Sequence, residues 1–294
     1  MYNTALKSES VHRKYRLSVI AVVAIFLLNV IATLMTSCVG EKGGSNYTLV
    51  FADVGQGDAA FAVSDDGSAV LIDCGTAEYS VKLIAEMKKY RVKRIDTIFL
   101  SHAHDDHFGG LFDVLSEFDV GKVVMPECSF EGSAGSKFDL WVKNGLKVVY
   151  TVCGDVYEPI GCRVNVLSPE RVEDGGGNED SAVMMMSIGK LRVLFTGDAG
   201  FVTEEFLTEK YGKGLAADIL KVGHHGSAGS SGENFLSAVA PTVAVISVGR
   251  SNGFGLPSGN ALERIGNTGA AIYRTDLDGT VVFLVDESGY RPKK

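Results

Sequence analysis

The 294-residue sequence has little proline, few cysteines and fewer basic than acidic residues, and these shortages exclude several classes of protein. Its 6 prolines and 35 glycines are too few for a low-complexity chain. With 46% hydrophobic and 22% charged residues, the composition is close to that of an average globular protein, which excludes intrinsic disorder and a fibrous repeat. The 36 acidic residues outnumber the 28 basic ones, so bulk charge does not favour binding to nucleic acid.

The 5 cysteines are spaced in a way that fits no zinc-binding pattern. We expect Cys74 and Cys128 to be buried free thiols. Cys153 and Cys162 lie at the two ends of a short segment, where a hairpin would allow a disulfide bond between them. Cys38 stands apart, at the end of an N-terminal apolar segment.

That apolar segment is the one long hydrophobic run of the chain. Residues 17–35 carry no charged side chain, and at about 1.5 Å per residue a helix of this length would span about 28 Å, close to a bilayer core. Of the total charge of −8, the first 38 residues contribute +3, which leaves −11 for the rest. The basic residues precede the run, so the positive-inside rule predicts that everything after residue 38 lies outside the cytoplasm.

The run ends in Leu-Met-Thr-Ser-Cys at 34–38, which resembles a bacterial lipobox with Met35 in place of the usual leucine. Residues 1–38 are therefore predicted to be either an uncleaved membrane anchor or a lipoprotein signal that leaves Cys38 lipidated. Both possibilities hold the remainder of the chain at the outer face of a bacterial membrane.

After a glycine-rich linker at 39–46, short apolar runs alternate with segments of helical spacing. The runs predict strands at 47–54, 59–64, 69–75, 95–102, 122–126, 147–152, 163–169, 181–188, 191–198, 217–223, 242–249, 271–276 and 280–285. Helices are predicted at 81–90, 107–118, 136–144, 199–211, 232–239 and 258–266. We expect one α/β domain over 47–288 and a C-terminal tail at 289–294.

Histidine is scarce as well, but five of the 6 histidines fall in two short motifs. The first motif reads Ser-His-Ala-His-Asp-Asp-His at 101–107, where a predicted strand ends and a helix begins. His102 and His104 project to the same side of an extended chain, and Asp106 and His107 follow in the loop. Imidazoles and carboxylates that converge in this way are metal ligands, so the motif predicts a metal site.

The second motif reads Lys-Val-Gly-His-His-Gly-Ser at 221–227, again at the end of a predicted strand. Adjacent histidines point apart in a strand, but the flanking glycines allow a turn that presents His224, His225 or both. Asp198 ends a third predicted strand. Because a buried carboxylate without a partner is costly, it is a candidate to bridge two cations.

These motifs resemble those of the metallo-β-lactamase superfamily. The similarity rests on the His-x-His-x-Asp-His pattern at 102–107, on Asp73 at a strand end and on Leu-Phe-Thr-Gly-Asp ending at Asp198. More narrowly, six motifs resemble the soluble domain of ComEC-type competence proteins and related choline-phosphate esterases: DVGQGDA at 53–59, LIDCG at 71–75, SHAHDDHFGG at 101–110, NEDSAV at 178–183, LFTGDAG at 194–200 and LKVGHHGS at 220–227.

The resemblance implies a four-layer αββα sandwich and a hydrolase that uses one or two divalent metal ions, zinc first and manganese second. His102 and His104 would hold one ion, and Asp106 and His107 the other. Asp198 would bridge or complete the two sites. The hydrolase-like module would stand alone on its single anchor.

The later loop would add a ligand from His225 or His224, and Asp58 and Asp73 would orient the ligating histidines through hydrogen bonds. Two departures from the family pattern matter, and the second would weaken one site. The family's third histidine motif is replaced by Asn-Glu-Asp-Ser at 178–181, and Leu256 stands where the competence branch commonly has a histidine.

The implied reaction is attack by a metal-activated water on a phosphodiester. Asp106 and Asp198 would position the water, and either His224 or His225 would protonate the leaving group. The substrate would be DNA or a cell-surface phosphodiester. Two alternatives remain open at this point: a tethered binding module with a degenerate metal site, and a hydrolase of the lactonase or β-lactamase type.

Overall fold

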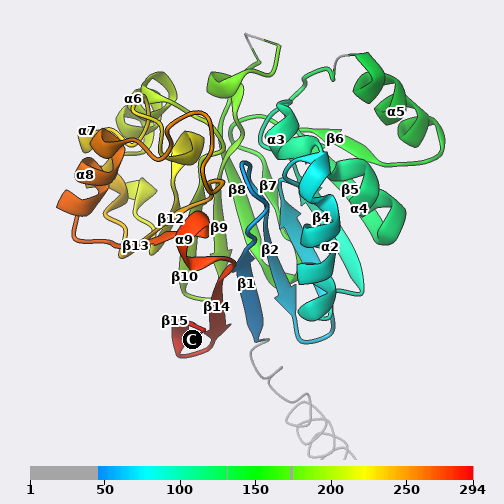
Figure 1. Ribbon diagram of the computed structural model, residues 1–294, viewed down its shortest axis with the longest axis horizontal. Coiled ribbons are helices and arrows are strands. Elements are labelled where there is room, and N and C mark those ends of the chain that lie inside the picture. The colour runs from blue at the N-terminus through cyan, green and yellow to red at the C-terminus, as the bar shows by residue number, and fades with distance from the viewer. Residues whose placement is uncertain (1–45, 131, 173–174, 294) are drawn as a thin grey trace, which may run out of the picture. The chain divides into compact units, whose positions relative to one another are not determined.

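The computed structural model describes residues 46–130, 132–172 and 175–293. Within them, two β-sheets lie face to face, and helices cover the outer face of each (Figure 1). The first sheet has eight strands in the order β15-β14-β1-β2-β3-β4-β5-β6, and the second has seven in the order β13-β12-β11-β10-β9-β8-β7. This arrangement confirms the two-sheet α/β sandwich that the resemblance implied.

The strands of the first sheet are β1 (Tyr47–Phe51), β2 (Ala60–Ser64), β3 (Ser68–Ile72), β4 (Arg94–Phe99), β5 (Asp119–Met125), β6 (Val148–Tyr150), β14 (Val281–Asp286) and β15 (Gly289–Pro292). Those of the second are β7 (Val156–Tyr157), β8 (Arg163–Ser168), β9 (Val183–Ile188), β10 (Leu191–Phe195), β11 (Ile219–Lys221), β12 (Val243–Ile246) and β13 (Ala271–Arg274). Helices α2 (Ser80–Lys89), α3 (Asp105–Phe108), α4 (Leu111–Glu117) and α5 (Gly132–Lys143) lie on the side of the first sheet. Helices α6 (Phe201–Tyr211), α7 (Glu233–Val239) and α8 (Gly259–Asn267) lie on the side of the second, and α9 (Thr275–Asp278) follows β13.

The central strands, such as β2, β3, β9 and β12, are buried on both faces, which explains why they appear in the sequence as continuous apolar runs. Along β1, Leu49 and Phe51 point into the layer between the sheets, whereas Val50 points toward the helices. The ring of Phe51 stacks on that of Phe195 at 5.9 Å and meets Phe283 edge-on at 6.2 Å. The contact with Phe195, which lies on β10, joins the two sheets, and the contact with Phe283 extends the cluster along the first sheet.

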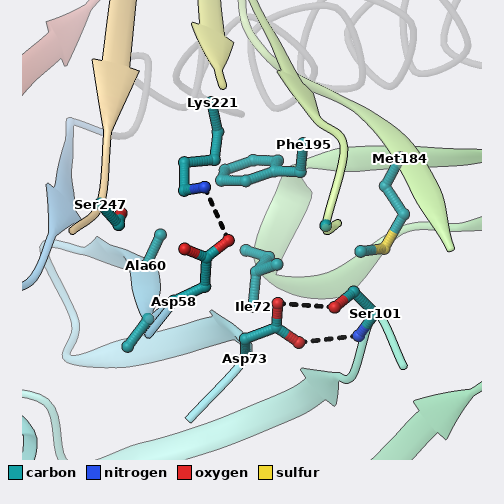
Figure 2. Close-up of a pocket in the computed structure, with 11 residues that line it drawn as sticks. Asp58, Ala60, Ile72, Asp73, Ser101, Met184, Phe195, Lys221 and Ser247 are labelled. Carbon is teal, nitrogen blue, oxygen red and sulfur yellow. Dashed lines mark hydrogen bonds and ion pairs between the residues drawn. The ribbon is translucent and has the colours of Figure 1, made fainter. Parts of the chain in front are cut away.

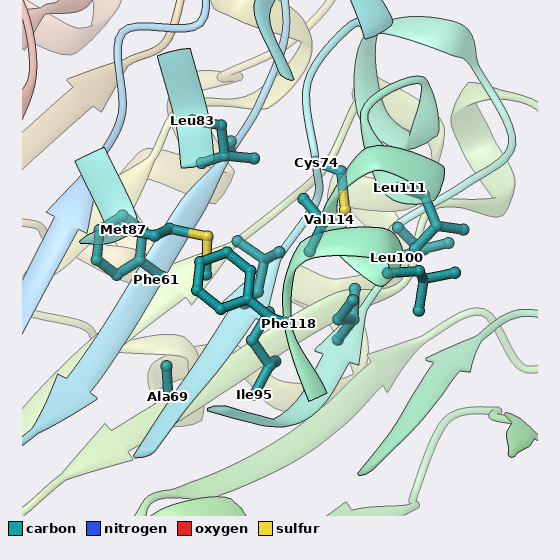
Figure 3. Close-up of a cluster of buried hydrophobic side chains, with 14 of the residues drawn as sticks. Phe61, Ala69, Cys74, Leu83, Met87, Ile95, Leu100, Leu111, Val114 and Phe118 are labelled. Atoms are coloured by element: carbon teal, nitrogen blue, oxygen red, sulfur yellow. The ribbon is translucent and has the colours of Figure 1, made fainter. Parts of the chain in front are cut away.

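A second core fills the space between the first sheet and its helices (Figure 3). Leu83 and Met87, four residues apart on α2, both face the sheet and are fully buried. Leu111 and Val114 do the same on α4. A matching core lies between the second sheet and helices α6 to α8.

The helix predicted at 107–118 is two helices, α3 and α4, separated at Gly109 and Gly110. The Gly110 amide donates a hydrogen bond to the carbonyl oxygen of Gly75 at 3.0 Å. A side chain at Gly110 would collide with the carbonyl oxygen of Cys74. The close approach of two loops therefore interrupts the helix, and glycine is what allows it.

At the C-terminus, residues 289–292 form β15, which pairs antiparallel with β14. The first sheet therefore continues past residue 288, where the sequence pattern places the start of a tail.

The disulfide that the spacing of Cys153 and Cys162 left open is not formed, because both residues are free thiols. Cys162 is buried in the layer between the sheets, whereas the Cys153 sulfur lies 3.0 Å from the hydroxyl of Tyr211. The two side chains therefore lie in different parts of the fold. Cys74 and Cys128 are free as expected, but only Cys74 is fully buried and Cys128 is partly buried.

The predicted anchor or signal at 1–38, with Cys38, and all but the last residue of the linker at 39–46 lie outside the described residues. Across the described ranges, every helix is too short or too polar to cross a lipid bilayer.

Candidate metal centre

The predicted site residues come together where strands of both sheets end. Asp73 follows β3, His102 follows β4, and Asp198 follows β10. His225 follows β11, and Asp58 lies in the connection between β1 and β2. Because these parallel strands all end at one edge of the sandwich, five distant segments of the chain share one site.

Backbone hydrogen bonds lock these loops to one another. The amide of Asp58 donates to the carbonyl oxygen of Asp106 at 3.0 Å, and the amide of Cys74 donates to that of His107 at 2.6 Å. The first loop approaches so closely that a side chain at Gly57 would collide with the Asp106 carbonyl oxygen. The histidine motif is thus held by its neighbours in space as well as by its own strand.

Asp198 lies at the centre of the site. Its Oδ1 is 3.2 Å from Nε2 of His107 and 3.7 Å from Nε2 of His225. Its Oδ2 faces the other way, 4.0 Å from Nε2 of His102 and 3.8 Å from Nε2 of His224. One carboxylate therefore faces two sets of imidazoles, one with each oxygen.

Two groups of potential ligands include Asp198, each with its ligand atoms within 4.8 Å of one another, and a third consists of Asp58, Asp73 and His107. We call Asp106, His107, Asp198 and His225 the four-residue cluster, and His102, His104 and Asp198 the three-residue cluster. Both groups mix imidazole nitrogen and carboxylate oxygen, which are the donors that zinc and manganese accept in proteins.

The hydrogen bonding of the site fits metal ions. Nε2 of His102, Nε2 of His107 and Oδ1 of Asp198 are buried and have no hydrogen-bond partner. Buried polar atoms are nearly always paired, so three unpaired ones around a single carboxylate group need an explanation. Divalent cations in the two clusters would satisfy all three atoms.

Carboxylates and a carbonyl fix the orientation of two of these imidazoles. Oδ2 of Asp73 lies 2.9 Å from Nδ1 of His107, and Ser101 donates to Asp73 through its amide at 2.7 Å and its hydroxyl at 2.8 Å. Nδ1 of His225 lies 2.9 Å from the carbonyl oxygen of Ser247 and 3.2 Å from Oδ1 of Asp58. Since a carbonyl and a carboxylate only accept, Nδ1 of each ring carries the proton and Nε2 is left to bind a cation.

The charges of the site shift the pKa values of its members in opposite directions. Burial alone would raise the pKa of Asp198, but His107 and His225 hold it well below its ordinary value. Burial alone would lower the pKa of His225, but Asp58 and Asp198 raise it to about 9. Burial, and then His107, hold the pKa of His102 well below its usual value, so this ring is neutral and ready to act as a ligand.

The two adjacent histidines differ in position. His224 and His225 adopt positive φ values of 48° and 52°, which side chains with a Cβ rarely adopt. This strained turn turns the two rings in different directions, with centroids 6.3 Å apart, so that His225 faces Oδ1 of Asp198 and His224 faces Oδ2. His225 is buried within the four-residue cluster. His224 is partly exposed, 3.4 Å from Nδ2 of Asn178.

Two residues of the site were missed from the sequence. Ser101 fixes Asp73, and Lys221 pairs with Asp58 at 2.7 Å. Nothing in the sequence distinguishes Ser101 from other serines. Lys221, in contrast, is a lone lysine in the apolar run of β11, and this pattern indicates a buried charge. Leu256 belongs to neither cluster: its side chain packs against the core under α6 to α8, and the Asn252 side chain binds its backbone amide and carbonyl.

A surface cleft of about 490 Å³ opens beside the three-residue cluster. His104, Asp105 and Phe108 line it on one side, and Gly175 to Gly177 line it on another. No lysine or arginine lines it.

Two packed β-sheets with histidine and carboxylate clusters at their strand ends define a class of metal-binding α/β proteins. The sequence matches the family model described as the metallo-beta-lactamase superfamily over residues 52–250, and the chain belongs to this superfamily. Its members are typically metal-dependent hydrolases.

Curated relatives cover most of this chain. It is 30% identical over 249 residues to ComE operon protein 3 of Bacillus subtilis, which is 79% of this chain and 32% of the relative. It is 31% identical over 233 residues to Recombination protein 2 of Haemophilus influenzae, which is 78% of this chain and 28% of that protein. Competence protein ComA of Neisseria gonorrhoeae is 30% identical over 244 residues, which is 82% of this chain and 33% of that protein. The chain thus spans about a third of the length of these relatives.

Solved structures share the fold at low identity. The metallo-beta-lactamase fold protein YhfI of Bacillus subtilis has a TM-score of 0.55 at 12% identity, with 82% of this chain and 99% of that chain covered. Zinc-bound PqqB of Methylobacterium extorquens has a TM-score of 0.51 at 13% identity, with 80% of this chain and 99% of that chain covered.

Proposed function

We propose that this protein is a metal-dependent hydrolase that cleaves a phosphodiester, with a divalent cation in each of the two clusters that share Asp198. The observation that carries the proposal is the set of three buried, unpaired ligand atoms around that carboxylate. Hydrogen bonds hold the reverse side of the His107 and His225 rings, so these rings are already oriented.

Cations held in these clusters would lower the pKa of a water molecule and neutralise charge on the phosphate oxygens. Asp106, with 28% of its side chain exposed, is the carboxylate of the four-residue cluster that reaches toward solvent, and it would position the attacking water. His224 is the better placed proton donor for the leaving group, because His225 already uses Nδ1 on the Ser247 carbonyl oxygen and directs Nε2 at the cluster.

The substrate we propose carries one phosphodiester near the cleft, either DNA or a phosphodiester displayed on a cell surface. The names of the relatives, for competence and recombination, support DNA. The cleft, which no lysine or arginine lines, and the acidic composition of the chain support a small or surface-displayed group. Zinc is the first choice of metal because imidazole donors predominate, and manganese is the second.

We also propose that residues 1–38 tether this domain at the outer face of a bacterial membrane, by an anchor or by a lipid on Cys38. The charge pattern and the apolar run of the sequence support this location. Metabolic labelling of a Cys38→Ser variant with a fatty acid would separate the two modes of attachment.

The test measures metal content and turnover of a chromogenic bis-aryl phosphodiester for the full chain loaded with zinc or manganese. We expect two equivalents of metal and measurable turnover. The double variant His102→Ala/His104→Ala should lose at least 100-fold in turnover while its circular dichroism spectrum is unchanged, because the three-residue cluster would retain Asp198 alone.

His12→Ala removes the one histidine outside both motifs and serves as the matched control, which we expect to behave like the parent. Equal turnover by the double variant and the parent would refute the proposal. A chain that takes up no metal would point to a binding module instead, and lactone turnover far above phosphodiester turnover would point to a lactonase.

A further inference from the structure

Lys221 is a charged residue in an apolar layer. It is the last residue of β11, and its side chain points into the space between the two sheets with 3% of the residue exposed. Figure 2 shows it beside Phe195, with Ile72 and Met184 nearby. Nζ of Lys221 lies 2.7 Å from Oδ2 of Asp58 and donates a hydrogen bond to the carbonyl oxygen of Val222 at 2.8 Å.

Stability alone does not account for this ion pair. Removing two charges from water costs several kcal/mol each, and replacing a buried pair by apolar residues is often neutral or stabilising. At Lys221, the neighbouring strand residues Ile219 and Val243 pack as ordinary apolar side chains in the same layer. A lysine here therefore points to a role in the site above it.

The contacts of Asp58 indicate that role. Its Oδ2 is bound to Lys221, and its Oδ1 lies 3.2 Å from Nδ1 of His225. Nε2 of His225 in turn lies 3.1 Å from Oδ2 of Asp106 and 3.7 Å from Oδ1 of Asp198. The lysine thus reaches the four-residue cluster through one carboxylate and one imidazole.

The corresponding arrangement behind His107 uses no cation. There, the amide and hydroxyl of Ser101 hold Asp73 (Figure 2), and Asp73 lies against Nδ1 of His107. Burial alone would raise the pKa of both carboxyl groups. The pKa of Asp73 does rise, whereas Lys221 and His225 hold the pKa of Asp58 well below its ordinary value. Among the side chains that line the small cavity between the two carboxylates, Lys221 is the one with a positive charge.

We propose that Lys221 is a positioning residue of the metal centre: its ammonium group fixes Asp58, which lies with the Ser247 carbonyl oxygen against Nδ1 of His225 and so helps to direct Nε2 of that ring at the four-residue cluster. The inference rests on the proposed metal-dependent function. It concerns one of the two clusters only, because the three-residue cluster has no contact with Asp58 or Lys221 among the interactions of the described residues.

The test is titration with zinc in competition with a chromogenic chelator, for the full-length parent, Lys221→Met, Asp58→Asn and the double variant. We expect Lys221→Met to lower the zinc affinity of one of the two sites by about 10–100-fold and to leave the affinity of the other site unchanged. The double variant should be no weaker than Asp58→Asn alone, since the lysine acts through that carboxylate. Lys210→Met, which removes an exposed lysine paired with Glu170, is the control and should bind like the parent.

Thermal unfolding separates positioning from a merely structural role. If Lys221→Met melts at a lower temperature but binds both equivalents as tightly as the parent, the proposal is wrong. Should this variant fail to fold, the double variant decides, because it leaves no unpaired charge in the core: full affinity for both equivalents would refute the proposal. A parent that binds no zinc would refute the proposed function and this inference together, whereas two tight sites in the parent and in Lys221→Met would refute this inference alone.

Discussion

The carboxylate of Asp198 is the residue on which both clusters depend. Its two oxygens face different imidazoles, and the residue is buried. His107 and His225 hold its pKa well below the ordinary value, despite burial, so it is ionised at any physiological pH. A permanently charged, buried carboxylate between two groups of imidazoles is an arrangement that cations stabilise.

Metal binding should therefore release protons. Burial alone would lower the pKa of His225, but Asp58 and Asp198 raise it to about 9, so in metal-free protein the ring is protonated at neutral pH. Because an imidazolium cannot act as a ligand, metal affinity should rise with pH up to about 9. Calorimetric titration at pH 7 in buffers of different ionisation enthalpy measures this directly. We expect release of at least one proton per molecule, and an enthalpy that is the same in every buffer would contradict the prediction.

The sequence predicted the candidate metal ligands better than the residues that hold those ligands in place. The two histidine motifs could be found because metal-binding side chains cluster in sequence at strand ends. Ser101 and Lys221 could not be assigned, because their roles depend on which carboxylate lies nearest in space. Spacing alone also left His224 and His225 equivalent, and only the strained turn separates them.

Among the elements, helices α6 and α8 fasten the loop that follows His225. The Glu204 carboxylate on α6 accepts the amide hydrogens of Ser231 at 2.5 Å and Gly232 at 2.7 Å. From α8, Arg264 donates to the carbonyl oxygen of Ser231 at 2.8 Å. The loop between the second histidine motif and α7 is thus held from two sides.

This link makes the stability of the fold depend on pH. Burial raises the pKa of Glu204 from 4.5 to about 7, against the backbone donors that favour the ionised form. Below pH 4.5 the carboxyl group of Glu204 is protonated in both the folded and the unfolded protein. Between pH 4.5 and 7 the unfolded chain loses the proton first, so the contribution of Glu204 to stability is lost as pH rises, by about 3 kcal/mol in all.

Urea unfolding of metal-free protein at pH 5 and pH 8 tests this dependence in the parent and in Glu204→Gln. We expect the difference in unfolding free energy between the two pH values to shrink in the variant, because a glutamine does not titrate. The lost acceptor would lower the stability of the variant equally at both pH values. An unchanged difference would show that Glu204 does not titrate in this range.

Strand positions were predictable at the element scale because a strand buried on both faces appears as an apolar run. Helix boundaries were less so. The break between α3 and α4 depends on the contact between Gly110 and the loop at Cys74, which local pattern does not reveal. The same limit applies to β15, whose pairing with β14 begins after a turn that contains polar residues.

For the whole molecule, the layer between the two sheets is the part that makes them one folding unit. Phe283 on β14 is fully buried and meets Phe51, Tyr273 and Tyr290 with ring centroids 5.9–6.2 Å apart. Replacing it by alanine should lower the free energy of unfolding by about 3–5 kcal/mol, with a single transition in urea. Val81→Ala, at a position 76% exposed, is the control and should change it by less than about 0.5 kcal/mol. A loss below about 1 kcal/mol in Phe283→Ala would contradict the role of this layer.

The layered architecture was implied by the motifs and not by the spacing of apolar residues, which predicted strands and helices without their order in two sheets. The spacing of two cysteines likewise left a disulfide open that the structure does not contain. Cys153 and Cys162 are near in sequence, but one contacts Tyr211 and the other is buried between the sheets. Contacts between segments far apart in the sequence determine both the order of the strands in the two sheets and the positions of these cysteines.

Anomalous X-ray diffraction from crystals of the chain soaked in zinc or manganese is the most direct test of the metal centre. We predict two peaks on opposite sides of the Asp198 carboxylate, one within the four-residue cluster and one within the three-residue cluster. The absence of a peak beside Asp198 under conditions that support turnover would contradict the proposal.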